Sequence, residues 1–213
     1  MTHASPGVPE GRLTEWLLRG FALLVYGFAV QNLARGWLAD PTRWTLLFLL
    51  ATEGYTLALV LFARRAHLRD MAPLTIAATV YAAFFFVLIN ARDTVHLVPE
   101  AVGIALQAVG MAYQFYAKYT LGRLFGLLPA RRAIVVAGPY RVVRHPIYLG
   151  YLIGHVGFLL ANFSVRNAAV LGLLYAAQVL RIVREERLLT TSDEYRRYRE
   201  RVRWRWRLLP RVF

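Results

Sequence analysis

The 213-residue sequence contains no cysteine, and only 18% of its residues carry a charged side chain. Without cysteine the chain has no disulfide, no thiolate metal ligand and no cysteine nucleophile. Its five histidines lack the His-x-x-x-His spacing of helical zinc sites, so we expect no metal centre. A P-loop and a Gly-x-Gly-x-x-Gly dinucleotide motif are also absent from the sequence.

Hydrophobic residues make up 58% of the chain, and its mean hydropathy is +0.42. They gather into stretches of about 20 residues, the length that crosses a hydrocarbon core of about 30 Å. This composition excludes an ordinary soluble domain. The sequence predicts an all-α polytopic integral membrane protein with about five to six transmembrane helices. The expected spans are residues 16–38, 44–63, 72–91, 98–121, 146–161 and 165–183.

The basic residues indicate how these spans are oriented. If the N-terminus is cytosolic, 22 of the 26 Lys and Arg residues fall in cytosolic segments, and only Arg35, Arg43, Arg92 and Arg166 lie outside. By the positive-inside rule we expect both termini in the cytosol. The net charge of +14 then suits anionic lipid headgroups and not nucleic acid. The short chain and its Arg-rich composition favour a bacterial inner membrane.

The sequence divides at about Leu121. Residues 1–121 hold four spans with short loops, and residues 122–213 hold a basic loop, a hairpin of two shorter spans and a basic tail. We expect the chemistry in the second part, with a cofactor site on the cytosolic side. An apolar stripe predicts an interfacial helix in the tail, and Thr191 with Glu194 fits a capping box that would start it. The stripe consists of Tyr195, Tyr198, Val202 and Leu209.

Two features inside the spans stand out. Glu53 lies near the middle of the second span, where an ionised carboxylate is costly, so it is either a functional group or a paired or protonated structural one. Arg19 or Arg35 on the preceding span could pair with it. The Gly150-x-x-x-Gly154 motif would allow the two short spans to approach closely.

The segment GPYRVVRHPIYLG (residues 138–150) joins the basic loop to the fifth span. Pro146 suits the first position of a helix, and the free N–H groups of that end, with Arg144 beside them, favour an anion. The segment RIVREER (residues 181–187) brings carboxylates and arginines to the same membrane face. A small zwitterion with an additional positive charge would suit both the helix start at Pro146 and the charged segment 181–187.

Residues 138–150, Glu185-Glu186-x-x-Leu189, Tyr195-x-x-Tyr198-x-x-x-Val202 and Leu209-Pro210 follow one another with characteristic spacing. This order resembles the isoprenylcysteine carboxyl methyltransferase family of membrane enzymes and is similar to the related phospholipid N-methyltransferases. The resemblance covers about residues 121–210. It implies an S-adenosyl-L-methionine-dependent methyltransferase whose acceptor is lipophilic or amphipathic, such as a prenylcysteine-like carboxylate or a phospholipid-like amine.

The resemblance also implies roles for individual residues. Glu185 would contact the amino end of the cofactor, and Arg181, one helical turn earlier, would meet the carboxylate of the acceptor. Glu186 is a candidate base if the acceptor is an amine, and Glu53 is a further candidate for acceptor binding. The other cofactor-binding residues would be Val135, Val136, Tyr140, His145, Pro146, Ile147 and Tyr148.

The sequence departs from the family at two places. No Phe-Gly pair precedes Tyr195, and the tail reads RWRWR at residues 203–207 where a proline-containing link is common. Two other functions stay open. A membrane NADPH-dependent sterol-type reductase shares the Arg-His-Pro-x-Tyr motif, but it favours Asn at the position of Ile147. A non-enzymatic membrane scaffold or transporter would account for Glu53. The oligomeric state also stays open.

Overall fold

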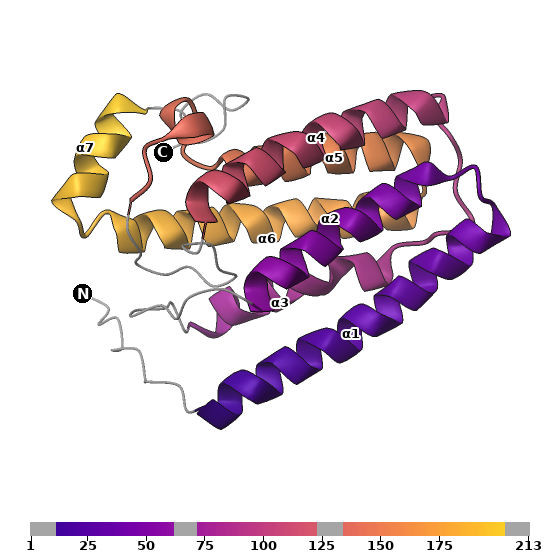
Figure 1. Cartoon of the computed structure of the whole chain (residues 1–213), viewed down its shortest axis with the longest axis horizontal. Coiled ribbons are helices and arrows are strands. Elements are labelled where there is room, and N and C mark those ends of the chain that lie inside the picture. Colours follow the sequence, from indigo (N-terminus) through magenta and orange to yellow (C-terminus); the bar gives the residue numbers. More distant parts are fainter. Residues whose placement is uncertain (1–11, 62–71, 123–133, 203–213) are drawn as a thin grey trace.

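The computed structural model describes residues 12–61, 72–122 and 134–202, and it confirms the all-α prediction for them (Figure 1). One isolated antiparallel bridge joins Val95 to Phe163. The elements are α1 (Arg12–Ala39), α2 (Trp44–Leu61), α3 (Pro73–Phe84), η1 (Phe85–Leu88), α4 (Glu100–Leu121), η3 (Gly138–Arg141), α5 (Pro146–Ala161), α6 (Val165–Leu189) and α7 (Asp193–Arg201).

The helices correspond to the expected spans with two differences. The third span is shorter than predicted, because α3 ends at Phe84 and a 3-10 turn carries the chain to Leu88. In contrast, α6 continues past residue 183 to Leu189. The last turns of α6 are rich in charged residues, and Glu186 is buried there against other polar groups. A prediction from hydropathy alone therefore placed the end of this helix too early.

By length and hydropathy, α6 is the one described helix that could cross a membrane. The segment Pro73–Leu88 and α5 are apolar but shorter. The count of five to six spans therefore stays a prediction, as does the division of the chain at Leu121.

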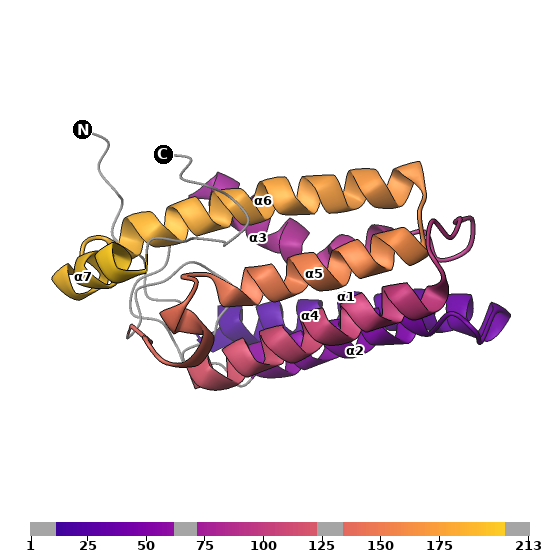
Figure 2. The same cartoon turned by 90° about the horizontal axis from the view of Figure 1, so that it is seen from above.

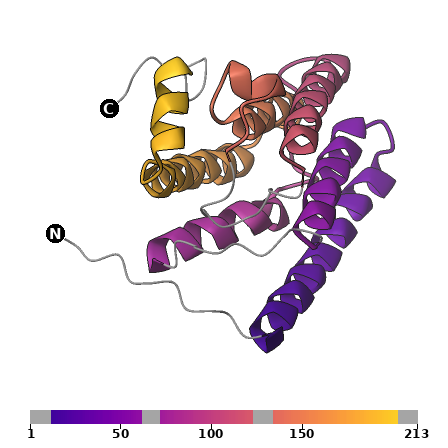
Figure 3. The same ribbon diagram turned by 60° about the vertical axis from the view of Figure 1, so that its left-hand side comes forward.

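The long helices run alongside one another, and their connections gather at two ends (Figures 1 and 2). We call the end with η3, the start of α5 and α7 the site end. The far end carries the turns at residues 40–43, 89–99 and 162–164. At the site end, α7 turns across the axis of α6 (Figure 3).

The helices α4 and α5 pack against each other through glycine. A Cβ atom on Gly110 would lie 2.4 Å from the backbone nitrogen of Gly154 and 2.6 Å from the carbonyl oxygen of Gly150. Such contacts are impossible for any larger residue. The Gly150-x-x-x-Gly154 motif therefore packs against α4, and the expectation that it packs against the next span is wrong.

An aromatic core holds the first helices to the last ones. Phe86 and Phe158 are fully buried, and Tyr26 packs on Phe86 with ring centroids 5.0 Å apart. Leu33, Leu46, Phe85, Leu171 and Leu174 belong to the same cluster. Burying a large apolar side chain stabilises the fold by about 1.5–3 kcal/mol.

Polar side chains fasten the far end. The Arg43 guanidinium, which is 6% exposed, donates to the backbone carbonyl of Ala91 and to the side chains of Thr94 and Asn162. Asn162 donates in turn to Thr45 Oγ1 at 2.8 Å. This network binds the turn between α1 and α2 to the turn between α5 and α6.

Candidate functional site

Residues 138–145 enter α5 through the short turn η3. Gly138 has a φ of 54°, and a Cβ atom there would lie 2.9 Å from Thr120 Oγ1. Glycine is required both by this left-handed backbone and by the close contact. Pro146 is the first residue of α5 and is buried, so the predicted helix start is confirmed.

Arg144, His145 and Glu186 form a buried ionic group, which we call the Glu186 cluster. Glu186 Oε1 lies 3.3 Å from Arg144 Nη2 and 3.1 Å from His145 Nε2. The side chains are 6%, 6% and 4% exposed, respectively. A buried carboxylate requires such partners. The cluster ties the start of α5 to the last turns of α6 and unites two of the predicted site residues, His145 and Glu186.

Arg181 lies beside this cluster on the same helix. Its Nη1 donates to Gln178 Oε1 at 2.7 Å, and its guanidinium carbon lies 5.7 Å from the centre of the Tyr148 ring. Arg181 is 8% exposed. The cation therefore lies on the α5–α6 seam, next to the predicted cofactor residue Tyr148.

Further along this seam, His155 Nδ1 lies 2.8 Å from the Tyr175 hydroxyl. Polar and aromatic side chains thus join α5 to α6, whereas glycine joins α5 to α4.

Glu185 is half-buried and lies next to Tyr140. Burial raises the pKa of the Tyr140 phenol well above its ordinary value, and the Glu185 carboxylate raises it further. Tyr140 is consequently neutral at physiological pH. Glu185 is more exposed than the adjacent Glu186.

The helix α7 closes over the same end. Tyr195, Tyr198 and Val202 are buried against Ile134 and Leu189. Burial raises the pKa of Tyr198 to about 12, with Arg144 lowering it and Glu186 raising it. The predicted apolar stripe is confirmed for these three residues, while Leu209 lies outside the described residues.

The predicted capping box is wrong. Helix α7 begins at Asp193, and its N-cap is Ser192, which makes no side-chain capping hydrogen bond. The last turn of α6 continues to Leu189, so Thr191 falls in the connection and not at a helix start.

The neighbours Val135 and Val136 differ in their surroundings. Val135 packs against the buried cluster of Ala117, Tyr140 and Ile147, whereas Val136 is 54% exposed. Val135 and Ile147 thus support the turn around Tyr140.

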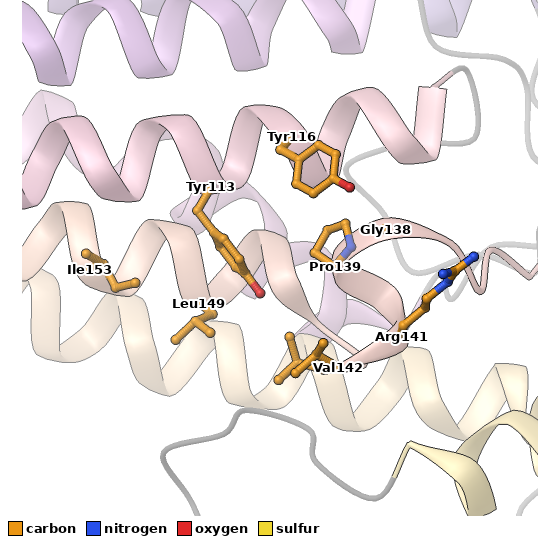
Figure 4. Close-up of a pocket in the computed structure, with 9 residues that line it drawn as sticks. Tyr113, Tyr116, Gly138, Pro139, Arg141, Val142, Leu149 and Ile153 are labelled. Atoms are coloured by element: carbon orange, nitrogen blue, oxygen red, sulfur yellow. The ribbon is translucent and has the colours of Figure 1, made fainter.

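A pocket of about 520 Å³ is lined by this turn together with α4 and α5 (Figure 4). It does not contain the Glu186 cluster, although Pro139 and Val143 on its wall are adjacent in sequence to Tyr140 and Arg144. This pocket and the tyrosines that α4 contributes to it were not predicted from the sequence. Its lining comprises Tyr113, Tyr116, Gly138, Pro139, Arg141, Val142, Val143, Leu149 and Ile153.

Glu53 is 5% exposed and interacts electrostatically with Lys118, near the end of α4. Lys118 is fully buried, donates to Gln114 Oε1 at 2.8 Å and lies 4.7 Å from the centre of the Tyr151 ring. Arg35, one of the two arginines expected to pair with Glu53, is instead exposed on α1. The side chain of the other, Arg19, lies outside the described residues. Lys118 was not predicted as a partner of Glu53, because it was counted among the cytosolic basic residues.

Among the described residues, no group of three or more His, Cys, Asp or Glu side chains is arranged to hold a metal ion.

Residues 98–196 match the family model described as phospholipid methyltransferase. This stretch of the chain is similar to phospholipid methyltransferases, and we call residues 98–196 the methyltransferase region. This finding confirms the resemblance to membrane methyltransferases that the sequence motifs indicated. The methyltransferase region runs from the turn before α4 into α7 and includes the Glu186 cluster, Arg181 and Glu185, whereas Glu53 lies before it.

Two curated relatives share part of this region. The nickel-cobalt-cadmium resistance protein NccN of Alcaligenes xylosoxydans xylosoxydans is 34% identical over 105 residues, which cover 45% of this chain and 48% of NccN. The cobalt-zinc-cadmium resistance protein CzcN of Cupriavidus metallidurans is 31% identical over 102 residues, which cover 47% of this chain and 44% of CzcN. The chain therefore spans less than half the length of these relatives. No solved structure matches it.

Proposed function

We propose that the protein is an S-adenosyl-L-methionine-dependent membrane methyltransferase that acts on a lipophilic or amphipathic acceptor. The observation that carries this proposal is the Glu186 cluster, which joins two motifs of the methyltransferase region at one end of the bundle. In this proposal the protein is multi-pass, its termini and the site end face the cytosol, and the membrane is a bacterial inner membrane.

The residues at the site end fit the cofactor. Its carboxylate would suit the free N–H groups at the start of α5, because the first turn of a helix lacks intrahelical acceptors for them. Its ammonium would suit the half-buried Glu185. The Tyr195 hydroxyl is buried, with no hydrogen-bond partner among the described residues, and offers a further contact. Val135, Val136, Tyr140, His145, Pro146, Ile147 and Tyr148 would complete the binding surface.

Bound S-adenosylmethionine would supply an electrophilic methyl group on its sulfonium. The chain would contribute orientation and exclusion of water, and α7, docked over Tyr140, is suited to the second task. Arg181 would hold an anionic group of the acceptor. Glu53, which lies deeper among the helices, is the further acceptor-binding candidate.

The acceptor decides whether a base is needed. A carboxylate acceptor attacks without losing a proton, so no residue would have to act as a base. An amine acceptor must lose one, and the His145–Glu186 pair would receive it, with Glu186 orienting the imidazole.

Calorimetry on the detergent-purified protein with S-adenosylmethionine, S-adenosylhomocysteine and NADPH tests the proposal. We expect the two sulfur compounds to bind and NADPH not to bind. Glu185→Ala should weaken S-adenosylhomocysteine binding at least about tenfold, since it removes a charged partner. Glu194→Ala, an exposed carboxylate on α7, is the matched control. Binding of NADPH alone would favour the reductase, and binding of none of the three would favour a non-enzymatic protein.

The names of NccN and CzcN refer to metal resistance. Growth of a strain without this protein on nickel, cobalt, zinc and cadmium salts tests whether that property extends to this chain.

A further inference from the structure

The pocket between α4, η3 and α5 has an apolar end and a charged end, and the two are separated along the axis of α5. Ile153 and Leu149 of α5 line one end, and Arg141 of η3 extends at the other (Figure 4). Tyr113 and Tyr116 of α4 form the facing wall. The pocket is therefore apolar along the helices and cationic at the site end.

The pocket opens toward the outside of the bundle. Tyr116 is 55% exposed and Val142 is 46% exposed, and Arg141 is also exposed. Its volume of about 520 Å³ lies within the range of ligand pockets, about 300–1,000 Å³. In the proposed orientation its apolar end lies in the hydrocarbon region and Arg141 lies at the cytosolic interface, where tyrosine and arginine are typical.

We propose that this pocket binds an anionic membrane phospholipid, with an acyl chain along Leu149 and Ile153 and the phosphate at Arg141. The pocket has its apolar wall toward the membrane interior and its cation toward the cytosol. A lipid of the cytosolic leaflet has its acyl chains and its headgroup in the same order. None of the described residues that line the pocket is an aspartate or glutamate, so the ammonium of a zwitterionic headgroup would find no counter-ion among them. A headgroup with net negative charge is therefore preferred.

A bound lipid would act on the site through the turn it touches. Pro139 and Val143 line the pocket, while Tyr140 and Arg144, which follow them in sequence, face α7 and the Glu186 cluster. The lipid would brace residues 138–143 from outside. This inference concerns a lipid-binding site apart from the proposed methyl acceptor; it rests on the membrane orientation of the proposed function but not on the reaction.

Photo-crosslinking in nanodiscs tests the site. The probe is phosphatidylglycerol with a diazirine in one acyl chain, and labelled residues are mapped by mass spectrometry. We expect labels at Tyr113, Leu149 or Ile153, and an approximately fivefold loss of these labels in Arg141→Ala. Arg92→Ala, an exposed arginine at the far end, should leave them unchanged. Ile153→Trp, which fills the apolar end, should abolish them.

A second probe distinguishes this site from ordinary lipid contact. Diazirine phosphatidylethanolamine should label the pocket several-fold less than the anionic probe. Equal labelling by both probes, or labelling that neither Arg141→Ala nor Ile153→Trp reduces, would overturn the inference. Binding of S-adenosylhomocysteine is measured on the same samples, so a failure of the proposed function is seen separately.

Discussion

The Tyr198 hydroxyl of α7 donates a hydrogen bond to the backbone carbonyl of Tyr140 at 2.7 Å. Both side chains are buried. The bond joins α7 to the turn that precedes α5, across 58 residues of sequence. Because Tyr140 lies beside Glu185 and its turn continues into the Glu186 cluster, the docking of α7 and the geometry of the site are coupled.

Tyr198→Phe should loosen α7 without disturbing the rest of the bundle. The substitution keeps the buried ring and removes a hydrogen bond worth about 1 kcal/mol. We expect faster hydrogen exchange in residues 193–201 and weaker S-adenosylhomocysteine binding. Tyr119→Phe, at an exposed tyrosine on α4, is the control. Unchanged exchange in α7 would contradict the coupling.

Docking of α7 should also weaken at alkaline pH. Burial raises the pKa of Tyr198 from 10.0 to about 12, so the docked phenol keeps its proton where a free phenol loses it. The stabilisation is complete below pH 10 and declines as the pH rises from about 10 to about 12. Hydrogen exchange of α7 measured against pH should show this decline in the wild type. A Tyr198→Phe protein with the same profile would show that another group is responsible.

Glu186→Gln should destabilise the protein more than Glu185→Gln does. Glu186→Gln removes the charge that lies 3.3 Å from Arg144 Nη2, and breaking a buried ion pair costs about 3–5 kcal/mol. Glu185 is half-buried, so its loss should affect ligand binding more than unfolding. Thermal unfolding in detergent, with and without S-adenosylhomocysteine, measures both effects. Equal unfolding temperatures for the two variants would contradict this assignment.

The Glu53–Lys118 pair should behave as a coupled unit. Glu53→Gln or Lys118→Met alone removes one of two buried groups that interact electrostatically, and each should lower stability by about 1–3 kcal/mol. The double variant removes both charges and should be more stable than the sum of the single effects predicts. Unfolding of the four proteins of this cycle gives the coupling energy. Additive effects would mean that the two groups act independently.

Gly110→Ala should disrupt the contact between α4 and α5. The added methyl group would lie 2.4 Å from the nitrogen of Gly154, and such overpacking costs about 1–3 kcal/mol. Gly172→Ala on α6 is the matched control, because a methyl group added there would meet nothing within 4 Å. At that position the better helix propensity of alanine should keep or raise stability. The unfolding temperatures of the two variants should therefore move in opposite directions.

Some features could be predicted from local sequence because they depend on neighbouring residues. Pro146 sets the start of α5 through its fixed backbone angle, and the tail stripe around Tyr195 and Tyr198 follows from helical periodicity. The pairing of helix faces does not follow from periodicity. For that reason the helix that packs on the Gly150-x-x-x-Gly154 motif was predicted wrongly, and the interaction of Glu53 with Lys118 was not predicted.

At the site, too, local features could be predicted from the sequence, whereas tertiary contacts could not. The motifs indicated that residues 138–150 and 181–187 meet, and the Glu186 cluster joins them. Which of the two adjacent glutamates is buried depends on the rotation of α6, a tertiary property. The pocket beside Arg141 combines three elements, and no single stretch of sequence describes it.

The far-end network has a consequence for how the protein is assembled. Arg43 reaches Asn162 across 119 residues of sequence. A chain is synthesised from its N-terminus, so α1 and α2 exist well before Asn162 does. Until then the Arg43 guanidinium lacks a main acceptor and is more stable in water than between helices. We therefore expect the turn between α1 and α2 to reach its final position only after the end of α5 has emerged, so that closure of the far end is a late step of biogenesis.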